Sequence, residues 1–212
     1  MTNTNSILGV YLSDSLDLDA IYGNALRDEA SDVVLRHPHE IDNPEDVRFA
    51  ICWLPNDKAF ESYPNLELAM SIGAGVDALL AHPGLKDEVH IARVRDPHQA
   101  DLMAGFAAHE VLHREREFTT LEQNAAKAHW APLTMRAPAS RKVAVLGHGT
   151  MGRAVVKAVA ALGFSVHVAC RSEPQAPVEG VTYLTGDGAV MAAGDGADYL
   201  INVLPLTATT EP

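Results

Sequence analysis

The chain has 212 residues, of which 47% are hydrophobic, and this length allows one large or two modest domains with buried cores. Its formal net charge of −12 argues against nucleic acid or an anionic membrane as a partner, because both require basic surfaces. Two cysteines are too few for a disulfide framework, and neither a leader peptide nor an apolar run of membrane-spanning length is evident. We therefore expect a cytoplasmic protein.

Short apolar runs alternate with polar or helical stretches through the first hundred residues. This rhythm is typical of a parallel α/β sheet, and the runs predict strands over 7–12, 33–35, 49–54, 66–72 and 89–94. Asp14 or Ser15 is expected to cap the first helix, and Asp77 to cap the helix that follows the fourth strand.

A long helical pattern follows, from about Gln99 to Arg116, with a second helical piece near 120–128. Residues 130–140 contain two prolines and several small residues, which is typical of a linker. These boundaries predict a first domain over 1–98, a helix and linker over 99–140, and a second domain over 141–212.

The second domain opens with an apolar strand, a glycine turn, a helix and another strand, over residues 142–172. Gly147, Gly149 and Gly152 have the GxGxxG spacing, which provides a sharp turn, close approach of the backbone to phosphate, and close packing of helix on strand. Amides at the start of the helix, at Thr150 and Met151, would point at the anion. The pattern predicts a dinucleotide-binding site.

The residues after the second strand bear on which dinucleotide binds. An NAD site usually has Asp or Glu there to bind the ribose hydroxyls, whereas this chain has Cys170, Arg171 and Ser172. A guanidinium and a hydroxyl suit a 2′-phosphate, so NADPH is favoured over NADH. Glu173 weakens this reading, and Arg171 as a solvated loop charge is the alternative.

This second domain is expected to be incomplete. A doubly wound dinucleotide fold has two halves, whereas only four strands are predicted after Arg141, over 142–147, 165–169, 181–184 and 198–203. The strand at 200–203 would then form an exposed sheet edge.

Six stretches resemble the D-isomer-specific 2-hydroxyacid dehydrogenases, most closely their glyoxylate/hydroxypyruvate reductase A branch. They occur in family order: ICWLP at 51–55, SIGAGVDALL at 71–80, ADLMAGFAAHEVLHR at 100–114, VAVLGHGTMGRAV at 143–155, CRS at 170–172 and LINVLPLTATTEP at 200–212. The resemblance implies a flavodoxin-like N-terminal substrate domain followed by an incomplete Rossmann-type domain. It also implies NAD(P)H-dependent reduction of a small 2-keto acid, and a homodimer formed through the long helix, with Phe106, His109, Leu112 and His113 in its surface.

The resemblance also implies roles for individual residues. Backbone amides around Ala74, Gly75 and Val76 would hold the substrate carboxylate, and Trp53 would line the substrate pocket. Met103 would lie near the nicotinamide of the cofactor, and the cofactor would be bordered by Leu204, Pro205 and Thr210.

Two departures from the family bear on activity. The family reduces its substrate with an Arg and a Glu-paired His, yet no Lys, Arg or His follows Arg171, so we assign no catalytic residue. These groups are expected beyond the end of the chain, which would then have no appreciable reductase activity alone. Where the family usually has Glu in the long helix, this chain has Gly105, and this puts the local packing in doubt.

Two other functions stay open. His109, Glu110 and His113 spell HExxH, which on a helix can bind zinc and supply a general base for hydrolysis, although the third histidine of the extended motif is missing. The other alternative is a protein without catalysis that binds dinucleotide or acts through assembly.

Overall fold

The computed structural model describes residues 6–207 and 210, and the chain divides into two compact units. Of the described residues, unit 1 comprises 6–95, 205–207 and 210, and unit 2 comprises 96–204. The long helix and the linker, expected between two domains, both lie in unit 2. No helix in the described part of the chain has the length and apolarity that a bilayer crossing requires.

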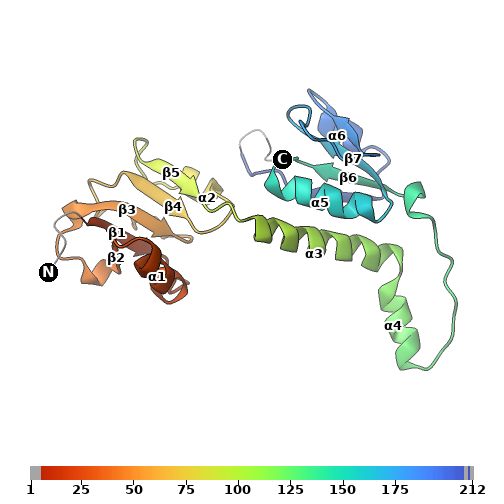
Figure 1. The fold of residues 1–212 in the computed structure, drawn as a ribbon, viewed down its shortest axis with the longest axis horizontal. Helices are drawn as coiled ribbons and strands as arrows, with labels where there is room; N and C mark the ends of the chain where they lie inside the picture. Colours follow the sequence, from red (N-terminus) through yellow and green to blue (C-terminus); the bar gives the residue numbers. More distant parts are fainter. Residues whose placement is uncertain (1–5, 208–209, 211–212) are drawn as a thin grey trace. The chain divides into compact units, whose positions relative to one another are not determined.

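Unit 1 is built on a five-stranded, wholly parallel sheet with the order β2-β1-β3-β4-β5 (Figure 1). Its strands are β1 (Ile7–Leu12), β2 (Val33–Arg36), β3 (Val47–Cys52), β4 (Leu68–Ser71) and β5 (His90–Arg93). Its helices are α1 (Leu18–Glu29), α2 (Asp77–Leu80) and the short 3-10 helices η1 (Pro38–Glu40) and η2 (Pro44–Asp46). This strand order is that of flavodoxin-like sheets, so the predicted fold of the first domain is confirmed.

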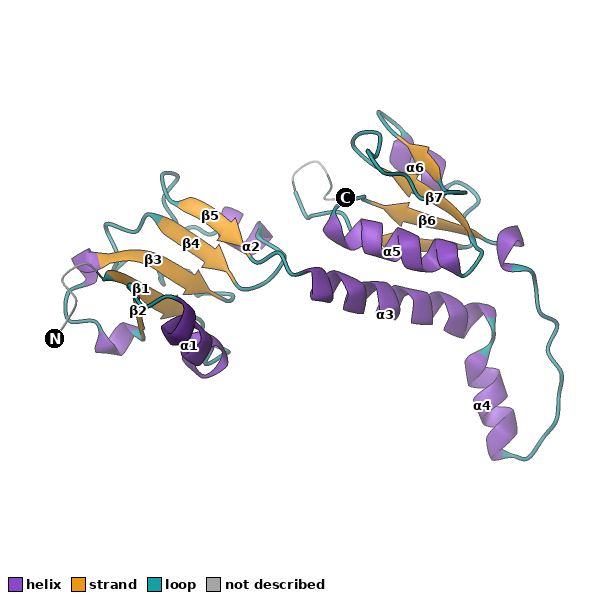
Figure 2. Cartoon of the chain, in the orientation of Figure 1, coloured by secondary structure: helices purple, strands orange, loops and turns teal. Residues whose placement is uncertain are grey.

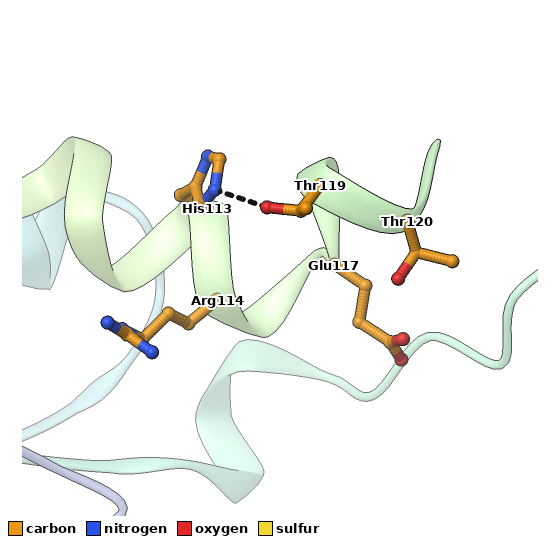
Figure 3. A pocket seen from close by; sticks show the side chains of 5 residues that line it. All are labelled: His113, Arg114, Glu117, Thr119 and Thr120. Carbon is orange, nitrogen blue, oxygen red and sulfur yellow. Dashed lines mark hydrogen bonds between the residues drawn. The ribbon is translucent and has the colours of Figure 1, made fainter. Parts of the chain in front are cut away.

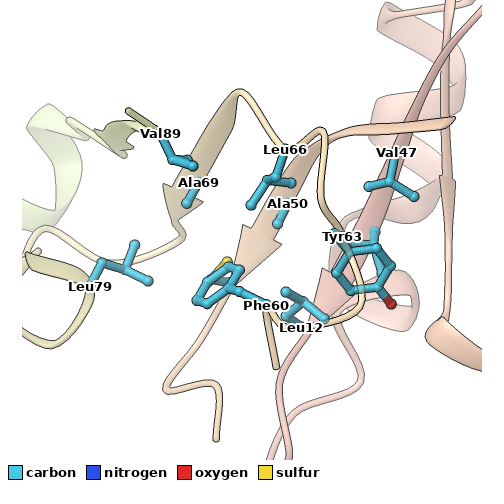
Figure 4. Packing of buried hydrophobic residues seen from close by; sticks show 11 residues of the cluster. Leu12, Val47, Ala50, Phe60, Tyr63, Leu66, Ala69, Leu79 and Val89 are labelled. Carbon is cyan, nitrogen blue, oxygen red and sulfur yellow. The ribbon is translucent and has the colours of Figure 1, made fainter. Parts of the chain in front are cut away.

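Apolar side chains from alternating strand positions form the main core of unit 1 (Figure 4). Phe60 and Tyr63, from the segment between β3 and β4, pack with Leu12 and Leu79 against the sheet. Burial on this face follows the two-residue period of a strand, since Val10 and Leu12 enter this cluster while Tyr11 enters a separate one. The sheet is therefore packed on both faces.

Two local predictions, for the cap of α1 and for the end of β3, are wrong. Asp17 caps α1, where its carboxylate accepts from the amide of Ala20 at 3.0 Å, while the carboxylate of Asp14 accepts from the side chain of Asn56. The third strand ends at Cys52, because Leu54 has a φ of 43°, in the left-handed region that a strand does not adopt.

Unit 2 contains a four-stranded parallel sheet with the order β8-β7-β6-β9 (Figures 1 and 2). Its strands are β6 (Lys142–Leu146), β7 (Ser165–Ala169), β8 (Thr182–Leu184) and β9 (Tyr199–Asn202). Its helices are α3 (Pro97–Glu115), α4 (Phe118–Ala126), α5 (Thr150–Ala161), α6 (Ala189–Gly194) and the 3-10 helix η3 (Pro138–Ser140). The strand order equals the first four positions of the Rossmann order 3-2-1-4-5-6. The outer edge of β9 is unpaired among the described strands.

Helix α3 packs along α5 through a stripe of small side chains (Figure 1). Ala100, Ala104, Ala107 and Val111 are its buried apolar residues, and their three- and four-residue spacing places them on one face. Gly105 lies outside this stripe, and a Cβ there would meet nothing within 4 Å. The helix runs through Gly105 without interruption, so the doubt about local packing is not supported.

A buried carboxylate, that of Glu115, links the end of α3 to the sheet through hydrogen bonds. The Glu115 side chain is only 2% exposed, and its Oε2 accepts from Arg141 Nε at 3.0 Å and from the Tyr199 hydroxyl at 2.6 Å. Burial alone would raise the pKa of Glu115, but these hydrogen bonds and the charge of Arg141 lower it below its ordinary value. Arg141 also pairs with Asp198. Glu115 thus connects the end of α3 with the residue before β6 and with the first residue of β9.

Candidate functional site

The glycine turn after β6 has the geometry of a phosphate loop. Gly147 has a φ of 102°, which side-chain-bearing residues rarely adopt, and a Cβ there would lie 3.1 Å from the carbonyl oxygen of Val203. A Cβ on Gly152 would lie 2.1 Å from the carbonyl oxygen of Gly147, so only glycine lets α5 pack this close to the turn. Two of the three glycines are therefore required by the fold itself.

Gly149 differs from the other two, because a Cβ there would meet nothing within 4 Å. The space in front of this residue is open, as a ligand that approaches the backbone requires. Gly149 is also the N-cap of α5 and has no side chain with which to cap it, so the amides at Thr150 and Met151 remain available to an anion. A dinucleotide pyrophosphate fits this cradle.

The segment after β7 holds the predicted 2′-phosphate residues. The amide of Cys170 donates to the carbonyl of Leu184, which ties this residue to β8. Arg171 and Ser172 are exposed, and among the described residues Arg171 has no ion pair or side-chain hydrogen bond. Its guanidinium is therefore available to a ligand at the carboxyl end of β7.

The other predicted cofactor residues are divided between the units. Leu204 lies in unit 2, where its Cδ2 would be 3.3 Å from a Cβ on Gly147, so it borders the glycine turn. Met103 lies on α3 in the same unit and is 43% exposed. Pro205 and Thr210 belong to unit 1, where the Thr210 hydroxyl donates to the Pro205 carbonyl.

All four predicted substrate residues lie in unit 1, at the carboxyl ends of neighbouring strands. Trp53 follows β3, and residues 74–76 follow β4, which pairs with β3. The aromatic ring of Trp53 packs over Gly73, since a Cβ on Gly73 would be 2.8 Å from its Cζ3 atom. The N-cap of α2 is Val76, and the predicted cap Asp77 is instead the first residue of the helix. The structure therefore brings the indole and the 74–76 turn to one edge of the sheet.

A residue that the sequence did not indicate also reaches this turn. Arg93, the last residue of β5, donates from Nη1 to the carbonyl oxygen of Ala74 at 2.5 Å. The amide of Gly73 donates to Ser71 Oγ at 3.1 Å. No local motif connects Arg93 with a turn 19 residues earlier, so only the sheet register could have revealed the contact.

The HExxH residues lie on α3, where they contact other side chains. The His109 and His113 rings are 5.4 Å apart, but Glu110 lies 3.4 Å from His109 Nδ1, and His113 Nε2 is hydrogen-bonded to Thr119 Oγ1 at 2.9 Å. His113 lines an open hollow of about 320 Å³ where α3 meets α4 (Figure 3). Among the described residues, no three His, Cys, Asp or Glu side chains converge as metal ligands.

A family model for the NAD binding domain of the D-isomer specific 2-hydroxyacid dehydrogenases matches residues 109–212. The chain belongs to this family. Glyoxylate/hydroxypyruvate reductase A of Serratia proteamaculans is 32% identical to it over 174 residues, which cover 80% of this chain and 54% of the relative. The reductase A of Salmonella typhi is 32% identical over 173 residues, with 79% and 54% covered. The chain thus spans about half the length of these curated relatives.

Solved structures of the family agree with the fold. A D-isomer specific 2-hydroxyacid dehydrogenase from Xanthobacter autotrophicus, in complex with NADPH and MES, has a TM-score of 0.82 and 32% identity, over 97% of this chain and 65% of that one. An NADPH-dependent glyoxylate/hydroxypyruvate reductase from Sinorhizobium meliloti, in complex with NADP and sulfate, has a TM-score of 0.81 and 26% identity, over 96% and 64%. The predicted family and the predicted Rossmann-type domain are confirmed.

Proposed function

We propose that this protein is an NADPH-dependent reductase of a small 2-keto acid of the glyoxylate or hydroxypyruvate type. The observation that carries the proposal is the glycine turn after β6, in which Gly147 and Gly152 are sterically required and Gly149 faces open space. The relatives named above support the substrate class, since those from Serratia and Salmonella are glyoxylate/hydroxypyruvate reductases.

The residues of unit 2 would hold the cofactor as follows. Amides at Thr150, Met151 and Gly152 would bind the pyrophosphate, and Arg171 with Ser172 would bind the 2′-phosphate of NADPH. Leu204 and Met103 would border the cofactor, as would Pro205 and Thr210 of unit 1. The bound nicotinamide would supply the hydride for reduction of the ketone.

The residues of unit 1 would hold the substrate. Amides at Ala74, Gly75 and Val76 would bind its carboxylate, and Trp53 would form one wall of the pocket. No catalytic acid or base is assigned among the described residues, because no Lys, Arg or His follows Arg171. We propose that the 212 residues alone bind nucleotide without appreciable turnover.

A homodimer through α3 and α4 is the second part of the proposal. Large apolar side chains are exposed on these helices, with Leu102 at 75% and Phe106 at 62%. His109 and His113 lie on the same helix, whereas Leu112 packs against the core of unit 2 and contributes less to the surface. Light scattering should show a dimer that Phe106→Glu converts to a monomer, while Met191→Glu, on the exposed face of α6, should leave it intact.

The test of cofactor choice is nucleotide affinity. Arg171→Met should weaken NADPH binding by about tenfold to a hundredfold, the value of a charged hydrogen bond, and leave NADH binding within about twofold. Lys157→Met, which removes the same charge from an exposed position of α5, is the matched control. Equal loss of both nucleotides in Arg171→Met, or equal affinity of the wild type for both, would refute the NADPH preference.

A further inference from the structure

Arg93 is the strongest candidate for a role beyond those already assigned. We infer that Arg93 is a positioning residue, whose guanidinium holds the Ala74 carbonyl so that the Gly75 amide faces the substrate carboxylate. The inference rests on the proposed function, since it concerns the same 74–76 turn.

The sheet register brings Arg93 to this turn. Strands β4 and β5 are parallel, and Arg93 stands beside Ser71, the last residue of β4. The amide of Val94 donates to the Ser71 carbonyl at 3.2 Å, which extends the pairing past the end of β5. The exposed Arg93 side chain then needs to cross only the short distance to Ala74, where Nη1 donates to the carbonyl oxygen.

This contact fixes the orientation of one peptide group. The described chain has no cis peptide bonds, and in a trans peptide the carbonyl of Ala74 and the N–H of Gly75 point in opposite directions. Since the guanidinium lies on the carbonyl side, the Gly75 N–H points away from it. Arg93 therefore acts through the peptide group and not by contact with the ligand.

The neighbouring amides indicate which donors remain for a ligand. The Gly73 amide is already bonded to Ser71 Oγ, whereas no acceptor within the described residues pairs with the amides of Ala74, Gly75 or Val76. A cationic donor on the Ala74 carbonyl also polarises the peptide and strengthens the N–H of Gly75 as a donor. Arg93 thus both orients this amide and increases its affinity for an anion.

The test uses the 212-residue chain, with oxalate as the probe. Oxalate resembles a 2-keto acid in carrying a carboxylate beside a second carbonyl carbon, and it cannot be reduced. Calorimetry should show that Arg93→Met weakens oxalate binding about tenfold or more, while Arg95→Met, an equal change of charge two residues away, changes it by less than about twofold. Arg93→Lys should restore part of the affinity, because an ammonium can still donate to the carbonyl.

A second measurement examines the peptide group without ligand. The Gly75 amide resonance of the free protein should shift in Arg93→Met and stay in place in Arg95→Met. Unchanged oxalate affinity in Arg93→Met would overturn the inference. Weakened affinity with an unmoved Gly75 resonance would overturn it as well, because it would indicate that Arg93 contacts the ligand directly. A wild-type chain that does not bind oxalate would overturn the substrate assignment of the turn itself, and the two failures are therefore distinguishable.

Discussion

The turn after β4 and the turn after β6 both present backbone amides at the carboxyl ends of parallel strands, but they are shaped in different ways. In the β6 turn the constraints come from the backbone, since Gly147 has a φ of 102° and the Gly147 carbonyl excludes a Cβ at Gly152. In the β4 turn they come from side chains, those of Trp53, Ser71 and Arg93. The first kind of turn requires a particular residue at each position, whereas the second requires partners from other strands.

The largest effect is expected at Gly152, because the β6 turn has no room there for an additional methyl group. In Gly152→Ala the Cβ would lie 2.1 Å from a backbone oxygen, so α5 or the turn must move. The free energy of unfolding should fall by about 3 kcal/mol, the upper range for an overpacked site. NADPH binding should be lost as well. Denaturant unfolding and nucleotide titration check the two effects.

Gly149→Ala is the matched control for this change. Its Cβ would meet no protein atom, so stability should stay within about 0.5 kcal/mol of the wild type. Nucleotide binding should nevertheless weaken, because the methyl group would stand where the phosphate approaches the backbone. A stable Gly152→Ala variant that still binds NADPH would contradict the claim that backbone contacts shape this turn.

A smaller effect is expected at Glu115, which supports the β6 turn indirectly. Tyr199 starts β9, and the same strand leads to Val203, whose carbonyl lies over Gly147. Glu115→Gln should lower the free energy of unfolding by about 2 kcal/mol, since hydrogen bonds to a charged, buried group are lost. Glu122→Gln, at an exposed position of α4, should change it by less than about 0.5 kcal/mol.

The Glu115 effect should depend on pH with a definite sign. Because the folded-state pKa of Glu115 is lowered, its stabilisation is full above the ordinary carboxyl value of 4.5 and is lost as the pH falls through the folded value. The stability difference between wild type and Glu115→Gln should therefore shrink in acid. A difference that stays constant from neutral pH to below pH 4 would show that the charge of Glu115 has no part in it.

The smallest effect is expected at Gly73, in the turn shaped by side chains. In Gly73→Ala the new methyl group would meet the ring of Trp53 at 2.8 Å, and a side chain can yield where a backbone carbonyl cannot. The loss of stability should be about 1 kcal/mol, with a shift in the fluorescence of Trp53. Gly75→Ala, whose Cβ would meet only the carboxylate end of Asp77, should leave the fluorescence unchanged. If Gly73→Ala lowered the stability as much as Gly152→Ala, side chains would constrain the β4 turn as strongly as the backbone constrains the β6 turn.

The difference between the two turns also explains which residues could be predicted from the sequence. Gly147, Gly149 and Gly152 could be predicted from their spacing between an apolar strand and a helix. The backbone restricts Gly147 and Gly152, the approach of a phosphate restricts Gly149, and both demands are met by one residue type at a fixed interval. The alternating apolar runs likewise predicted both parallel sheets, since burial on a sheet follows the chain locally.

Arg93 and Glu115 were not found, and the reason is physical. Their partners lie 19 residues away for Arg93 and 26 and 84 residues away for Glu115, and a charged residue in a helix or at a strand end usually faces solvent. The first helix cap was misplaced for a related reason, because Asp14 and Asp17 are equally good caps and the contact of Asp14 with Asn56 comes from the segment after β3, 42 residues away.

The position of β9 in its sheet has a consequence for the order of folding. It pairs with β6, the first strand of the sheet to be synthesised, although β7 and β8 are made in between. The buried environment of Glu115 is therefore complete only after Tyr199, 84 residues later in the chain, has been synthesised. During synthesis α3, β6 and β7 can associate and Glu115 can pair with Arg141 before β9 is made, but the Tyr199 hydroxyl reaches the carboxylate only when β9 pairs with β6. We therefore expect complete burial of Glu115 to be a late event in the folding of unit 2.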